Sequence, residues 1–116
     1  MKAYKYLSCS SRRTISASAV MADNFFRRFS GLIFRKRLKD DEVLVLKGCK
    51  SIHTIGMRYS IDAAFIDSEG KIVAAFKNLR PWRVTPYFPD AVLVMEARSG
   101  FLAKWSLDAG DRIIFE

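Results

Sequence analysis

The stretch SIDAAFIDSEGKIVAAFKNL, residues 60–79, places two apolar runs on either side of a polar turn. The turn, DSEG, includes Gly70, and glycine adopts a positive φ without steric cost. Two short apolar runs that flank such a turn are typical of a β-hairpin. We therefore predict an antiparallel hairpin here, and the expected fold is built outward from it.

Shorter patterns on both sides of the hairpin add further elements. Strands are expected where apolar and polar residues alternate, or where a compact apolar run is bounded by charge and glycine. These patterns predict strands over residues 14–20, 42–48, 91–97 and 112–116, with residues 50–56 considered as an extension of the second. A helix is predicted after the N-cap Asp23, from the helical spacing of Phe25, Phe26, Phe29, Leu32 and Ile33.

The order of these elements indicates the fold class. No helices separate the middle strands, so a parallel α/β sheet is not expected. Residues 99–111 are expected to contain one short helical turn between two tight turns. The sequence therefore predicts a mainly β (β-rich α+β) fold. We expect a small antiparallel barrel or jelly-roll-like sandwich with one N-terminal helix and one short C-terminal helical turn.

Length and composition point to one domain. The chain has 116 residues, 50% of them hydrophobic and 28% charged, so it can bury a core and is not disordered as a whole. We expect a single β-rich domain over residues 14–116, preceded by a loose basic arm over residues 1–13. We expect no membrane span and a cytoplasmic protein, because no apolar run is long enough and the first residues lack the apolar core of a signal peptide.

The positive charge is unevenly distributed. The net charge is +8; residues 1–41 hold ten Lys or Arg against three Asp or Glu, and residues 42–116 hold ten against nine. Such an excess indicates either an acidic partner or a solvated face that aids solubility. We expect at most weak, sequence-independent contact with polyanions through residues 27–39, because no stacking aromatic pattern of a nucleic-acid reader accompanies the charge.

Cys49 and the only histidine, His53, form the first candidate site. As nucleophile and base they would make a hydrolase or transferase, but such a pair needs contact at about 3 Å. On a straight strand the two residues would lie roughly 13 Å apart, so the pair requires a bend. With Cys9 they also fall short of a four-ligand zinc site unless acidic residues complete it, and we expect neither a metal nor a cofactor.

A carboxylate on an apolar strand face forms the second candidate site. Glu96 shares a face with Val92 and Val94, and burial without a partner would cost several kcal/mol. His53, Arg58, Arg80 and Arg83 are its candidate partners. Asp62 raises the same question on the hairpin. The alternative for both carboxylates is a buried polar knot that sets the strand register.

LRPWR, residues 79–83, forms the third candidate site. Trp82 can stack on a ligand ring, and the flanking arginines can clamp a phosphate or carboxylate. The alternative is a tryptophan that plugs the mouth of a barrel between solvated arginines. The candidate ligand-binding residues are His53, Thr54, Met57, Arg58, Arg80, Trp82, Arg83 and Glu96.

Five segments in order carry a resemblance to a known family. They are MADNFFRRFSGLIFRKRL, CKSIHTIGMRYSIDAAFIDSEGKIV, LRPWR, VLVMEARSG and LDAGDRI. Together they resemble the domain of unknown function 192 family (DUF192) over residues 14–116. The resemblance implies one compact β-rich domain related to jelly-roll sandwiches, with a helix near its start, and no established activity. Where the family usually reads ELPAG, this chain has MEARSG, Met95 to Gly100.

Three functional classes follow from these sites. The first is a binding module with a polar pocket for a small anionic or peptide ligand. The second is the Cys49 and His53 enzyme, which we consider weaker than the first. The third is an accessory protein that works through its basic N-terminal surface. The sequence names neither the ligand nor the oligomeric state.

Overall fold

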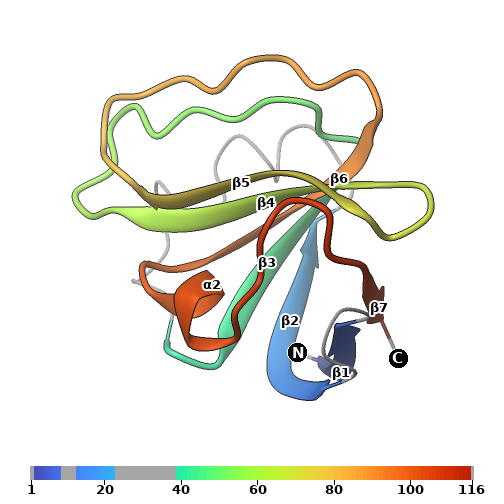
Figure 1. The fold of residues 1–116 in the computed structure, drawn as a ribbon. Coiled ribbons are helices and arrows are strands. Elements are labelled where there is room, and N and C mark those ends of the chain that lie inside the picture. Colours follow the sequence, from blue (N-terminus) through green and yellow to red (C-terminus); the bar gives the residue numbers. More distant parts are fainter. Residues whose placement is uncertain (1, 9–12, 23–38, 116) are drawn as a thin grey trace.

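The computed structural model describes residues 2–8, 13–22 and 39–115, and these form a mainly β fold with little helix (Figure 1). The elements are β1 (Lys2–Ser8), β2 (Arg13–Ala22), β3 (Glu42–Lys47), β4 (Ile61–Asp67), β5 (Ile72–Leu79), β6 (Ala91–Arg98), α2 (Phe101–Lys104) and β7 (Ile113–Phe115). The strands join one sheet in the order β5-β4-β6-β3-β2-β1-β7.

The hairpin predicted from the sequence is confirmed as β4 and β5. These strands pair antiparallel, with Ala64 opposite Ala75, and the turn between them closes with the Gly70 N–H on the Asp67 carbonyl at 3.0 Å. Strand β6 pairs antiparallel with both β4 and β3. One end of the sheet is therefore the four-stranded antiparallel unit β5-β4-β6-β3.

One pair of strands runs against the antiparallel expectation. Strands β2 and β3 pair in parallel, with Ala19 opposite Val43. A parallel pair needs a long connection, and the chain between these strands is long enough to supply it. The antiparallel sheet was predicted from the connections between the middle strands alone. That prediction was wrong for β2 and β3. The predicted N-terminal helix, residues 23–33, lies outside the described residues.

Residues 2–8 also differ from expectation. They were predicted within a loose arm, but they form β1, which pairs antiparallel with β2 along its whole length and with β7. Residues 2–8 form a strand because their main chain pairs with two neighbouring strands, β2 and β7. Local composition does not show such pairing, because the partners come from residues 13–22 and 113–115.

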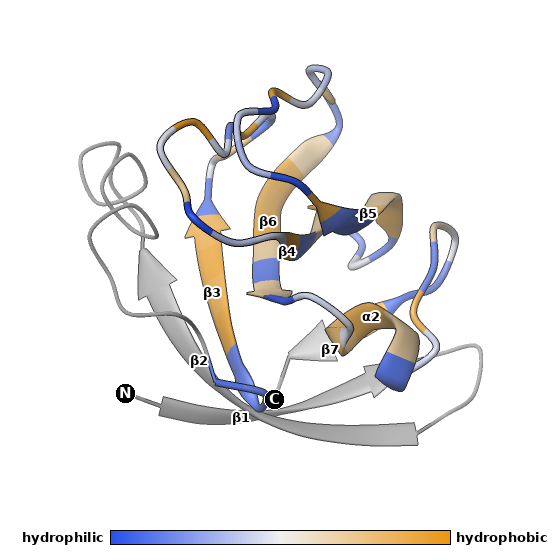
Figure 2. Cartoon of the chain, turned by 90° about the vertical axis from the view of Figure 1, so that its left-hand side faces the viewer, coloured by the Kyte–Doolittle hydropathy of each residue, from blue (hydrophilic) through white to orange (hydrophobic). Residues whose placement is uncertain are grey.

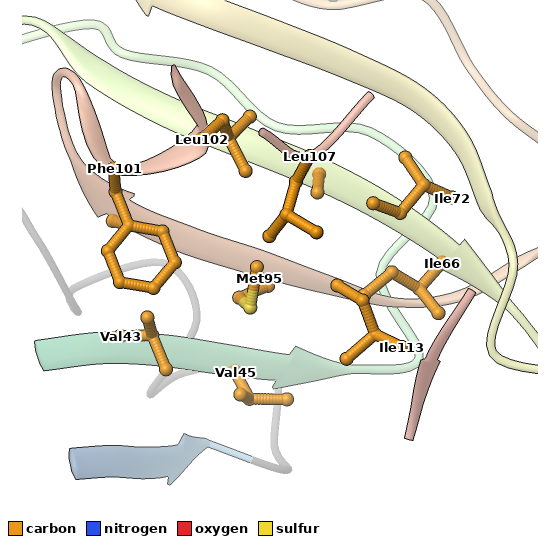
Figure 3. Packing of buried hydrophobic residues seen from close by; sticks show 11 residues of the cluster. Val43, Val45, Ile66, Ile72, Met95, Phe101, Leu102, Leu107 and Ile113 are labelled. Atoms are coloured by element: carbon orange, nitrogen blue, oxygen red, sulfur yellow. The ribbon is translucent and has the colours of Figure 1, made fainter. Parts of the chain in front are cut away.

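The sheet buries side chains on both faces. The face beneath α2 carries one apolar cluster (Figure 3): Val43, Val45, Ala64, Ile66, Ile72, Met95, Ala97, Phe101, Leu102, Leu107 and Ile113. The opposite face carries a second cluster: Leu44, Leu46, Cys49, Ile52, Met57, Ile61, Ala63, Phe65, Ala91 and Val94. Most residues of β3 and the first residues of α2 are accordingly hydrophobic (Figure 2). Strand β4 contributes to both faces, which explains why its residues 61–66 are all buried.

The first and last strands in the sheet order, β5 and β7, are joined at their starts by hydrogen bonds. The Ile113 N–H donates to the Gly70 carbonyl at 2.8 Å, and the Ile72 N–H donates to the Asp111 carbonyl at 2.8 Å. Gly70 has a φ of 82°, and a Cβ there would lie 2.5 Å from the Ile113 carbonyl oxygen. Glycine is thus required by both the turn and the contact. The described strands form an open sheet, and the narrower prediction of a barrel or sandwich is not confirmed.

Asp62 joins three parts of the fold. Its side chain is 1% exposed, and Oδ1 accepts the N–H of Asn78 at 2.8 Å. Oδ2 accepts the N–H groups of Gly100 at 3.1 Å and Leu102 at 2.9 Å, at the start of α2. Asn78 has a φ of 56° where the β4–β5 register shifts. The carboxylate therefore satisfies a bulged strand and a helix end, which is the polar knot expected as an alternative for Asp62.

We predict that Asp62→Asn destabilises the protein by about 3 kcal/mol, because an amide offers one acceptor oxygen and turns its own N–H groups toward buried donors. Asp67→Asn is the matched control. Asp67 also accepts two backbone N–H groups, from Glu69 and Lys71 at 2.9 Å, but in an exposed turn, so its loss should cost less than about 1 kcal/mol. Urea unfolding of both variants measures the difference, and equal midpoints would contradict the role given to Asp62.

Candidate functional site

Residues 48–60 and 80–89, here called the loop pair, run side by side above the sheet (Figure 1). The two segments connect β3 to β4 and β5 to β6. Cross-bonds join them: the Thr54 N–H donates to the Arg83 carbonyl at 2.8 Å, and the Phe88 N–H donates to the Lys50 carbonyl at 2.8 Å. The predicted extension of β3 over residues 50–56 was therefore wrong, since Gly48, with a φ of 70°, turns the chain toward the other loop.

Thr54 organises one end of the loop pair. It is fully buried, and its hydroxyl donates to the Arg80 carbonyl at 2.6 Å and accepts the Arg83 N–H at 2.9 Å. Its carbonyl accepts the N–H groups of Met57 at 3.1 Å and Trp82 at 2.9 Å. One side chain and its own peptide groups thus hold the LRPWR segment in place.

Lys50, Thr85 and Phe88 fix the other end. The Lys50 ammonium donates to the carbonyls of Pro89 and Ala91, both at 2.7 Å, and the Thr85 hydroxyl accepts the Ile52 N–H at 3.0 Å. The centroid of the Phe88 ring lies 4.7 Å from the centroid of the Phe65 ring in the core. Because both ends are tied to the sheet, the outer surface of the loop pair is presented on a fixed framework.

Trp82 lies on this outer surface. Its φ is 62°, and its side chain is 65% exposed. Arg80, Arg83 and Arg58 are exposed as well. Trp82 therefore does not plug a barrel mouth, and it stands between two arginines as the sequence arrangement suggested.

The other predicted ligand-binding residues lie deeper. Thr54 is fully buried, Met57 is 6% exposed within the core cluster, and His53 is half-buried. Glu96 is 4% exposed and lies opposite Leu44 and Ala63 on the same apolar face. The cluster of Glu96 with His53 and Arg58 stays a prediction.

Cys49 and His53 both contact main-chain groups. The Cys49 thiol donates to the Ser51 carbonyl at 3.0 Å, and the His53 Nδ1 accepts the Ile55 N–H at 3.2 Å. Cys49 is buried in the core face and is 9% exposed. These contacts give the Cys49 thiol an acceptor and the His53 Nδ1 a donor on the main chain, and the Cys49 and His53 pair stays a prediction.

Sequence reasoning did not single out two exposed apolar residues of the loop pair, Ile55 and Val84, whose side chains are 42% and 68% exposed. For Val84, which lies between Pro81 and Pro86, the prolines could have indicated this exposure; no comparable signal marks Ile55. Pro81, Pro86 and Pro89 interrupt regular pairing, so an apolar residue between them cannot be assigned to a buried strand face.

The described part of the chain contains neither a cluster of metal ligands nor a membrane-spanning helix. Within residues 2–8, 13–22 and 39–115, no three or more His, Cys, Asp or Glu side chains are grouped to hold a metal ion. The helix in the same ranges is too short to cross a membrane.

Comparison with known proteins identifies the family. The DUF192 model, described as "Uncharacterized ACR", matches residues 8–115. The chain belongs to the DUF192 family. This confirms the resemblance found in the sequence. A UPF0127 protein of Pyrococcus furiosus is 34% identical over 110 residues, which cover 92% of this chain and 94% of the relative.

Further comparisons give a second sequence relative and two solved structures that share the fold. A UPF0127 protein of Pyrococcus horikoshii is 35% identical over 98 residues, covering 80% of this chain and 83% of the relative. A solved candidate transcription regulator of Sinorhizobium meliloti 1021 superposes with a TM-score of 0.86 at 20% identity, covering 97% of this chain and 92% of that protein. A solved protein of unknown function from Novosphingobium aromaticivorans gives a TM-score of 0.82 at 17% identity, covering 97% and 83%.

We predict that Thr54→Val destabilises the protein by about 2 kcal/mol, because the near-isosteric change removes the hydroxyl that pairs with Arg80 and Arg83. Thr54→Ser is the matched control: it keeps the hydroxyl, loses one methyl group and should cost about 1 kcal/mol. Thermal or urea unfolding measures both. A Val variant as stable as the Ser variant would show that the hydroxyl does not hold the loops.

We also predict that Cys49 is not a nucleophile. In a Cys9→Ser background, iodoacetamide should alkylate the folded protein at least about tenfold more slowly than the urea-unfolded protein, because the thiol is buried and bonded to Ser51. Mass spectrometry follows the rates. Fast alkylation of the folded protein that persists at acidic pH would instead indicate an activated thiolate.

Proposed function

We propose that this DUF192 protein is a non-enzymatic binding module that holds an anionic ligand on the outer surface of its loop pair. One observation carries the proposal: Trp82, Arg80 and Arg83 are all exposed within one short segment, and residues 48–60 and 80–89 contain no acidic residue. The one acidic residue of the two connections is exposed Asp90, directly before β6. A guanidinium group presents a fork that matches a carboxylate or phosphate, and an indole face stacks on planar groups or on cations.

The charges elsewhere on the described surface are arranged differently. Lys77 pairs with Asp108 at 2.6 Å, Arg98 with Asp40 at 3.0 Å and Arg112 with Glu69 at 3.6 Å. In the described part of the chain, no carboxylate forms an ion pair with the loop-pair arginines, Arg58, Arg80 and Arg83. Among the described residues, the Arg83 guanidinium donates to the Trp82 carbonyl at 3.4 Å, so a ligand anion would compete with this weak bond but not with a carboxylate.

The proposed surface uses only some of the predicted ligand-binding residues directly. Thr54 and Met57 support the surface from below, whereas the three arginines and Trp82 are accessible to a ligand. The polar pocket predicted near His53 and Glu96 is not needed for such binding and is retained only as a prediction. The alternative partner surface, residues 27–39, lies outside the described residues except for Lys39.

Three anionic probes with different backbones test the proposal: poly-L-glutamate, a twenty-residue oligo-dT, and phosphatidylserine vesicles. We expect at least one to bind, and Arg80→Ala with Arg83→Ala to weaken that binding by at least about tenfold, since hydrogen bonds to charged groups each contribute more than 1 kcal/mol. Anisotropy of labelled probes, and co-sedimentation for vesicles, measure binding.

Two matched variants complete the test. Lys71→Ala with Lys104→Ala removes the same charge from exposed sites outside the loop pair and should leave binding within about twofold. Charge reversal of Arg35, Lys36 and Arg37 tests the N-terminal alternative. If that reversal abolishes binding and the Arg80 and Arg83 double variant does not, the loop pair is not the site.

A further inference from the structure

The loop pair contains a free main-chain edge at Val84. His53 and Val84 face each other as an antiparallel bridge, flanked by the bond from the Thr54 N–H to the Arg83 carbonyl and by the 2.9 Å bond from the Thr85 N–H to the Ile52 carbonyl. A pair flanked in this way is a non-hydrogen-bonded pair, whose own N–H and C=O groups point away from the partner segment. Those of Val84 therefore point to the outer side of the loop pair.

The outer side of Val84 is open. Its side chain is 68% exposed, and neither its N–H nor its carbonyl hydrogen-bonds to a residue in the described ranges. Neighbouring residues limit the edge: the Trp82 N–H is already bonded to the Thr54 carbonyl, and Pro86 has no N–H. The edge thus offers one donor and one acceptor, enough for a single residue of an added strand to exchange two hydrogen bonds with Val84.

Exposed apolar side chains surround this edge. The large hydrophobic residues that are exposed in the described part of the chain are Ile55, Trp82, Val84, Tyr87 and Val92, and the first four belong to the loop pair. Aromatic rings alone could stack on bases, but Ile55 and Val84 are aliphatic and complement apolar side chains. Several exposed apolar residues on two loops that are bonded to each other are consistent with an interaction surface.

We infer that the ligand of the loop pair is an extended, acidic protein segment that pairs its main chain with Val84. This inference rests on the proposed function. The segment's carboxylates lie against Arg58, Arg80 and Arg83, and its apolar side chains cover Trp82 and Tyr87. A peptide group both donates to the Val84 carbonyl and accepts from its N–H, whereas a phosphate only accepts. A protein segment therefore fits the edge better than a nucleic-acid backbone or an anionic membrane does.

The probe is a phage-displayed library of random twelve-residue peptides, selected against the immobilised full chain. We expect enrichment of peptides that combine Asp or Glu with alternating apolar residues. A synthetic consensus peptide should lose at least about tenfold in affinity against Val84→Pro, which lacks the N–H, and less than about threefold against Val84→Thr, which keeps the N–H and the branched shape.

Singly N-methylated versions of the consensus peptide give a second measurement that does not depend on the folding of the proline variant. Methylation at the residue opposite Val84 should weaken binding to the unmodified protein by at least about tenfold. The inference is overturned if no acidic and apolar consensus is enriched, if all N-methylated peptides bind like the parent, or if Val84→Pro binds like Val84→Thr.

The failures of the two proposals are distinguishable. Oligo-dT or vesicles that bind through Arg80 and Arg83, with no acidic peptide selected, would overturn this inference and leave the proposed function standing. Anionic probes that bind independently of Arg80 and Arg83, or do not bind at all, would overturn both.

Discussion

The arrangement of the sheet depends on one buried carboxylate. Asp62 lies on β4, within the antiparallel unit β5-β4-β6-β3, and accepts backbone N–H groups from β5 and from the start of α2. Without an acceptor at this position, the bulge at Asn78 and the first turn of α2 would leave buried donors unsatisfied. The same carboxylate therefore sets how β5 ends and where α2 lies on the sheet. Because the LRPWR segment begins where β5 ends, the loop pair inherits its position from this contact.

The loop pair combines a rigid base with an exposed top. Its buried side is fixed by side-chain hydrogen bonds from Thr54 and Thr85 and by the contact of Phe88 with Phe65. Its outer side carries guanidinium groups, two aromatic rings and the main-chain groups of Val84. Recognition surfaces held by a rigid scaffold lose little conformational entropy when they bind, so a short loop can be selective without a deep cavity.

Local patterns allowed much of the fold to be predicted. The β4–β5 hairpin, β6 and the short turn of helix follow from alternation, compact apolar runs and turn residues that lie close together in the sequence. The parallel pairing of β2 with β3, and the place of β1 beside β7, could not be predicted, because their main-chain bonds join distant segments of unremarkable composition. The candidate site, like the fold, could be predicted only in part. Trp82 and its arginines were visible as a motif, whereas the exposure of Val84 depends on a bridge to His53 in the other loop.

The pairing of β1 with β7 has a consequence for how the protein is made. In this pair Leu7 lies opposite Ile114, so the sheet joins residues that are separated by nearly the whole chain. On the ribosome, β1 is made before its partner β7, and the strands β2 to β6 are synthesised between them. The bonds between β1 and β7 therefore cannot form until β7 has been made, and until then one edge of β1 is open to other chains.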